Sequence, residues 1–126
     1  MKFPVETIRT FGEAVSVKAG MSPENAKIFI DNMINADLRN VRSHGITKFR
    51  GYLSRVEYGV SDIRAEPTIV RTAPAALAVD GNNGMGTTIA WKAMEACIET
   101  ARENGVAFAT IKMLPSTDSA VTYVMH

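Results

Sequence analysis

The residues best suited to chemistry lie in one short stretch, ADLRNVRSHGITKFRGYL, which covers residues 36–53. It contains one of the chain's two histidines, His44, between Ser43 and Gly45. An imidazole held by a neighbouring hydroxyl can give or take a proton near neutral pH. We therefore expect His44, with Ser43 beside it, to act as a catalytic acid/base. The alternative is a structural histidine that hydrogen-bonds a backbone group at the start of a helix.

Cations are concentrated around this histidine. Lys48 follows His44 by four residues, which puts both side chains on one face of a helix that begins near Ser43. A carboxylate bound by Lys48 would then lie close to the imidazole. That arrangement suits a 2-hydroxy or 2-keto acid, which needs an anion anchor beside a proton donor.

The other reactive residue types carry weaker signals. The turn DGNNGMG, residues 80–86, has glycines whose spacing fits neither a dinucleotide fingerprint nor a P-loop, so a tight turn is favoured over a phosphate site. Cys97 falls on the apolar face of a helical pattern, which favours core packing. Two histidines and one cysteine form no recognisable ligand cluster, so we expect no metal. The sequence leaves the cofactor-binding residues unassigned.

Three segments near the N-terminus have apolar residues at helical spacing: 4–19, 22–39 and 43–59. In the first, the predicted buried stripe is Val5, Ile8, Phe11 and Val15. The second has a natural N-cap in Ser22, followed by a proline that suits the first helical position. The third is predicted to begin near Ser43 and to stop at the glycine that follows Tyr58.

Beyond residue 60 the pattern changes to short strands around one helix. Strands are predicted at residues 68–72, 76–80 and 106–112, the last one buried, with a helix at residues 87–104. The fold class is therefore mixed α/β, a three-helix region followed by β-β-α-β. We expect two units, residues 1–60 and residues 61–126. Three strands and one helix seldom bury a core alone, so more chain or a partner subunit should complete the second unit.

Composition excludes several classes of protein. The chain has 126 residues, 46% hydrophobic and 21% charged, and its net charge of +1 gives no electrostatic case for nucleic acid or an anionic membrane. A single cysteine excludes an internal disulfide and suits a reducing compartment. The first residues lack the apolar run of a signal peptide, and no segment approaches the roughly 18 apolar residues of a membrane span. We expect a cytoplasmic protein with no membrane or nucleic-acid partner.

Two blocks of the sequence resemble a known family. ADLRNVRSHGITKFRGYLSRVEYG resembles the signature ADLRGVxSHGVxRxxxYxxRLxxG of the malate/L-lactate dehydrogenase family of the second type. That family includes ureidoglycolate, sulfolactate and diketogulonate dehydrogenases. AVDGNNGMGTTIAWKAMEACIETARENGVAFATIK resembles the family's next block, DGxxGxGxxxAxxAMxxAIxxAxxxGVAxVxVR. The resemblance covers the N-terminal portion of the family, from residue 1 to about residue 112 of this chain.

The resemblance implies hydride transfer between NAD or NADP and a small 2-hydroxy or 2-keto acid. It also implies a homodimer whose helical N-terminal region packs on a mixed, largely antiparallel sheet. His44 takes the place of the family's acid/base, with Ser43 as its neighbour. Lys48 stands where the family usually has a carboxylate-binding arginine. Because lysine lacks the bidentate arginine fork, Arg50 is a second candidate for binding the substrate.

The chain departs from the family after Lys112. Family members usually continue with a loop that contains a histidine, whereas this chain reads MLPSTDSAVTYVMH, with no histidine near Thr117, and ends at His126. Three interpretations follow: an N-terminal fragment of a family enzyme, a truncated or degenerate homologue that dimerises without catalysis, or a helical adaptor of other ancestry. We favour the fragment, and we expect this chain alone to be an incompetent dehydrogenase.

Overall fold

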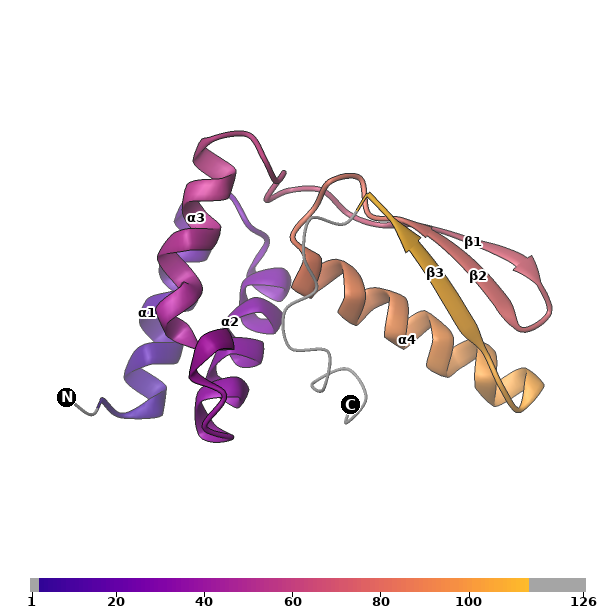
Figure 1. Ribbon diagram of the computed structural model, residues 1–126, viewed down its shortest axis with the longest axis horizontal. Helices are drawn as coiled ribbons and strands as arrows, with labels where there is room; N and C mark the ends of the chain where they lie inside the picture. Colours follow the sequence, from indigo (N-terminus) through magenta and orange to yellow (C-terminus); the bar gives the residue numbers. More distant parts are fainter. Residues whose placement is uncertain (1–2, 114–126) are drawn as a thin grey trace.

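The computed structural model describes residues 3–113 of the chain. Figure 1 shows the N-terminal helices standing together on one side and a sheet lying along the last helix on the other. This arrangement confirms the predicted mixed α/β class. The elements are α1 (Val5–Lys18), α2 (Pro23–Leu38), α3 (Phe49–Glu57), β1 (Thr68–Ala73), β2 (Ala76–Asp80), α4 (Gly86–Asn104) and β3 (Phe108–Lys112). Two short 3-10 helices, η1 (Arg42–His44) and η2 (Ile46–Lys48), join α2 to α3.

The described strands form a mixed sheet in the order β1-β2-β3. β1 and β2 pair antiparallel, with Thr68 opposite Asp80. β2 and β3 pair parallel, with Ala76 opposite Phe108, because α4 carries the chain back between them. The mixed sheet was predicted, and the described part contains one pairing of each kind.

Within residues 3–113, a helix covers one face of the sheet and leaves the other open. Val79, Ala109 and Ile111 pack against Ile89 and Ala93 of α4. The opposite face carries a hollow of about 400 Å³, whose lining includes Thr68, Val70, Ala78, Asp80, Thr110 and Lys112. The prediction of a wholly buried third strand is therefore wrong. β3 alternates, and Phe108 at its start is 60% exposed because no described element covers that side.

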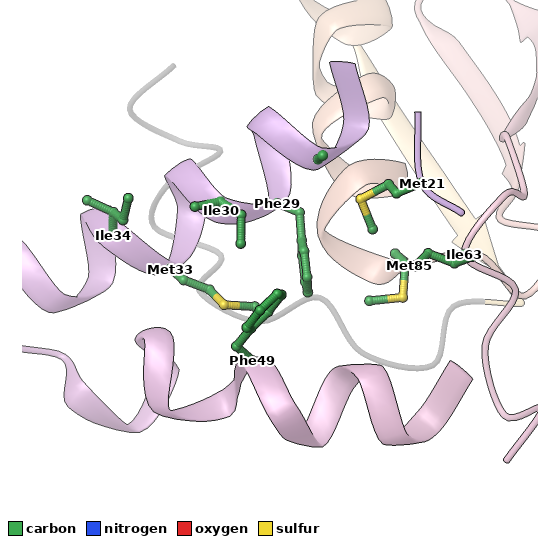
Figure 2. Close-up of a cluster of buried hydrophobic side chains, with 9 residues drawn as sticks. Met21, Phe29, Ile30, Met33, Ile34, Phe49, Ile63 and Met85 are labelled. Carbon is green, nitrogen blue, oxygen red and sulfur yellow. The ribbon is translucent and has the colours of Figure 1, made fainter. Parts of the chain in front are cut away.

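The main hydrophobic core lies between α2 and α3 and is drawn in Figure 2. The Phe29 and Phe49 rings lie 6.1 Å apart between centroids, and the Tyr52 ring meets Phe29 edge-on at 5.6 Å. Ile63 and Met85, which follow the helical region in sequence, complete the same cluster. The core thus joins residues from both sides of the predicted boundary at residue 60.

Local signals fixed several helix ends as predicted. The Ser22 hydroxyl accepts the Asn25 N–H at 3.2 Å and caps α2. α4 ends at Gly105, whose φ of 80° places it in the left-handed region that favours glycine. The predicted helix at residues 87–104 is confirmed. Within the described residues, no helix is long and apolar enough to cross a membrane.

The apolar stripe predicted for α1 is only partly buried. Ile8 and Val15 pack against the core, but Phe11 is 65% exposed. The face turned toward α2 is instead built on Gly12, where an added Cβ would lie 2.7 Å from Cδ1 of Ile30. The small residue lets the two helices approach closely, which an apolar periodicity count does not register.

Candidate active site

The loop that carries His44 begins where α2 ends. Asn40 takes a left-handed conformation with φ of 61°. Its N–H donates to the Asp37 carbonyl at 2.9 Å, and the Val41 N–H donates to the Ala36 carbonyl at 2.8 Å. This is the Schellman arrangement, which satisfies the last carbonyls of a helix and turns the chain away from its axis. The residues that follow leave α2 with a fixed direction.

Two 3-10 helices then place His44 at the end of the first and Lys48 at the end of the second. The His44 N–H donates to Val41 and the Lys48 N–H donates to Gly45, both at 3.0 Å. Gly45 between them is extended, with ψ of −165°, so helical hydrogen bonding stops there. The prediction of a helix from about Ser43 is therefore wrong, and α3 begins only at Phe49.

The predicted contact between Ser43 and His44 is present. The Ser43 hydroxyl oxygen lies 2.9 Å from Nδ1 of the imidazole. A hydroxyl can donate to a neutral Nδ1 or accept from a protonated one, so it holds the ring in both protonation states. The ring is half-buried, while Ser43 is exposed. Proton exchange with a bound molecule then falls to Nε2.

Lys48 and Arg50 are exposed cations that follow the histidine on other elements. Because Gly45 interrupts the helix, His44 and Lys48 do not share a helical face, and that argument for pairing them is wrong. Arg50 lies in the first turn of α3, next to the buried Phe49. The roles of these two cations in binding a carboxylate remain predictions.

The structure adds one residue to this site that sequence reasoning missed. The Asp37 carboxylate accepts the Ile46 N–H at 2.9 Å. It also lies against the α-carbon of Gly45, where an added Cβ would overlap it. The sequence signal was an acid in the last turn of a helix, where the macrodipole disfavours negative charge.

The DGNNGMG segment is the tight turn that we predicted. Asn82 and Asn83 both have positive φ, and the Asn82 N–H meets the Asp80 carboxylate at 3.0 Å. The N–H groups of Gly81, Asn83 and Gly84 donate to backbone carbonyls of the chain itself. These donors are therefore committed within the protein and do not form a cradle for a phosphate group.

Cys97 is half-buried on α4, and burial raises the pKa of its thiol. A raised pKa lowers the thiolate fraction and with it the reactivity of the sulfur. Among residues 3–113, no three histidine, cysteine or acidic side chains are grouped so that they could hold a metal ion.

Comparison with known proteins decides the family. The sequence family described as malate/L-lactate dehydrogenase matches residues 3–126. This chain belongs to that family. It is 32% identical to a malate dehydrogenase of Pyrococcus abyssi over 112 residues, which are 89% of this chain and 31% of that protein. It is 29% identical to the ureidoglycolate dehydrogenase (NAD(+)) of Escherichia coli K12 over 126 residues, 36% of that protein.

A solved structure shows the same fold. Malate dehydrogenase from Pyrococcus horikoshii OT3 superposes with a TM-score of 0.94 at 26% identity, over 99% of this chain and 36% of that one. The chain therefore spans about a third of the length of these relatives. The family assignment predicted from the two sequence blocks is confirmed, as is its match to the N-terminal portion.

Proposed function

We propose that this chain provides the proton-transfer residues of an NAD(P)-dependent dehydrogenase that interconverts small 2-hydroxy and 2-keto acids. A bound nicotinamide cofactor would supply the hydride for reduction of the keto acid. His44 gives its Nε2 proton to the carbonyl oxygen, and in the oxidation it takes the hydroxyl proton back. Lys48 binds the substrate carboxylate by charge, with Arg50 as a second cation.

The observation that carries this proposal is the 2.9 Å contact between Ser43 and His44. It fixes Nδ1 and leaves Nε2 for the substrate, which is what a general acid/base requires. The relatives support the substrate class, because malate and ureidoglycolate both carry a hydroxyl on the carbon next to a carboxylate. The second relative is named for NAD(+), which supports a nicotinamide cofactor.

None of the described residues is assigned to the dinucleotide. The glycine-rich turn fits it poorly, because the N–H groups of Gly81, Asn83 and Gly84 already donate to backbone carbonyls. The proposal therefore derives no step from cofactor binding within residues 3–113. We further propose that the protein acts as a homodimer and resides in the cytoplasm, where its lone cysteine suits a reducing environment.

The test is turnover of NADH or NADPH with a panel of 2-keto acids, measured on the natural protein that carries this chain. We expect His44→Ala to abolish turnover and Ser43→Ala to reduce it. Lys48→Ala should raise KM for the keto acid and leave KM for the cofactor unchanged. The matched control is Lys27→Ala, which removes an exposed lysine that pairs with Asp31 on α2. Full turnover by His44→Ala would refute the proposal.

A second candidate is a homologue that acts through dimerisation without catalysis. Uncovered apolar surface favours it: Val70 is 54% exposed on the open side of the sheet, and Phe11 is 65% exposed on α1. This candidate predicts a dimer by light scattering together with no consumption of NADH or NADPH. Consumption that depends on His44 would exclude it.

A further inference from the structure

Asp37 occupies a position that a helix alone disfavours. It lies in the last turn of α2, where the partial negative charge of the helix end repels a carboxylate. Its side chain is half-buried, so water offsets only part of that repulsion. An interaction with another element must account for this placement.

That interaction is with the backbone just after His44. The Asp37 carboxylate accepts the Ile46 N–H at 2.9 Å, across nine residues of chain. The same carboxylate lies against Gly45, whose missing side chain leaves the space for it. Asp37 thus ties the end of α2 to the first residue of η2.

A second bond closes the loop from within. The Thr47 hydroxyl donates to the Arg42 carbonyl at 3.1 Å. Both hydrogen bonds span His44 in the sequence. The histidine ends η1, and the extended residue Gly45 that follows it separates η1 from η2. Without the Asp37 anchor, the backbone that follows His44 would lose its hydrogen bond to the end of α2.

We propose that Asp37 is a positioning residue for His44. By accepting the Ile46 N–H, it fixes the backbone that follows the histidine and keeps the imidazole against Ser43. Its value for catalysis rests on the proposed function, whereas its effect on the geometry of the loop does not. The two can therefore be tested separately.

The first test uses the full chain labelled with ¹⁵N and needs no turnover. In Asp37→Ala we expect the Ile46 amide to exchange with solvent about tenfold faster or more. The amide would lose the hydrogen bond that protects it, and unprotected amides exchange through local opening. The chemical shifts of the His44 ring nitrogens should change as well. Asp37→Asn keeps an acceptor oxygen and should restore both signals. The matched control is Asp31→Asn, which removes a carboxylate from the same helix away from the loop.

The second test is turnover of 2-keto acids by the same variants. In Asp37→Ala we expect kcat to fall by roughly a hundredfold, with KM for the cofactor unchanged, because small misplacements of a catalytic group have effects of that size. Asp37→Asn should recover most of the rate. If wild type shows no turnover, the proposed function fails while the amide and imidazole signals still decide the role of Asp37.

A folded Asp37→Ala protein with unchanged Ile46 exchange and an unchanged His44 spectrum would overturn the proposal. If Asp37→Ala fails to fold, Asp37→Ser takes its place, because its shorter side chain does not reach Ile46 but keeps a polar group at the helix end. Unchanged signals in that variant would overturn the proposal equally.

Discussion

The Asn25 amide of α2 donates to the Glu66 carboxylate at 2.8 Å, although the two residues are 41 positions apart. Glu66 also pairs with Lys92 of α4 at 2.6 Å. Its backbone carbonyl accepts the Asn82 side-chain amide at 2.8 Å. Glu66, which lies between α3 and β1, thus links the helical region, the glycine-rich turn and α4.

Glu66 should make stability depend on pH. Burial by itself raises the pKa of its carboxyl, but hydrogen bonds from Lys92 and Asn25 outweigh it, so the pKa lies below its ordinary value. Because the pKa is lower in the folded state, the ionised carboxylate stabilises the fold at pH values above the ordinary pKa. This stabilisation is lost as the pH falls through the folded-state pKa. We expect urea unfolding between pH 7 and pH 3 to show this loss, and Glu66→Gln to flatten that part of the curve.

The matched control for this prediction is Glu99→Gln, which removes an exposed carboxylate paired with Arg102 within one helix. It should leave the shape of the pH curve unchanged. Because the Glu66 side chain is 52% exposed, salt should weaken its contribution. A Glu66→Gln curve that parallels wild type throughout would contradict the prediction.

The elements that sequence analysis located were those with local signals. Ser22 and the proline after it mark the start of α2, and Gly105 marks the end of α4, because caps depend on a few adjacent residues. Strand positions followed from turn residues and apolar runs. The family blocks added the order of elements but not their contacts.

What the sequence missed depends on contacts between separate segments. The start of α3 was misplaced because the chain between residues 42 and 48 is shaped by Asp37, not by its own periodicity. The exposure of Phe11 follows from the close approach at Gly12, which two helices determine together. Within the site, the bond between Ser43 and His44 was predictable because the two residues are adjacent, and the Asp37 anchor was not.

Gly45→Ala should destabilise the protein through a clash alone. The φ of Gly45 is −84°, which any residue adopts, but an added Cβ would overlap the Asp37 carboxylate. We expect a loss of about 1–3 kcal/mol in the free energy of unfolding, the usual effect of overpacking. The measurement is denaturant unfolding of single and double variants.

Two comparisons make this prediction specific. In the double variant Asp37→Ala, Gly45→Ala, the clash disappears, so the two effects should be less than additive. Gly51→Ala lies in α3 with no atom close to the new Cβ, and it should instead stabilise by about 0.5–1 kcal/mol. Additive losses in the double variant would show that Gly45 matters for another reason.

Asn40 should tolerate glycine and resist alanine. Its φ of 61° is left-handed, and the family signature has glycine at this place. Asn40→Gly should change the free energy of unfolding by less than about 0.5 kcal/mol, whereas Asn40→Ala should lower it by about 1 kcal/mol. Thermal unfolding of the two variants measures the difference. Equal stability of both would contradict a left-handed end to α2.

Asn25 and Asn32 lie two helical turns apart on α2, so they face the same side of the helix. Asn25 donates its amide N–H to Glu66, while its own side-chain oxygen lacks a partner among the described residues. The Asn32 side chain is buried at 1% exposure, and neither of its polar atoms has a hydrogen-bond partner among residues 3–113. Such a group destabilises the fold, since it has left water without compensation.

Replacing each asparagine by leucine should therefore have opposite effects. Asn32→Leu should raise the free energy of unfolding by about 1–2 kcal/mol, because it removes an unsatisfied amide from the interior. Asn25→Leu should lower it by about 1 kcal/mol, because Glu66 loses a donor. Urea unfolding of both variants at neutral pH measures the pair. A loss of stability in Asn32→Leu would contradict this prediction.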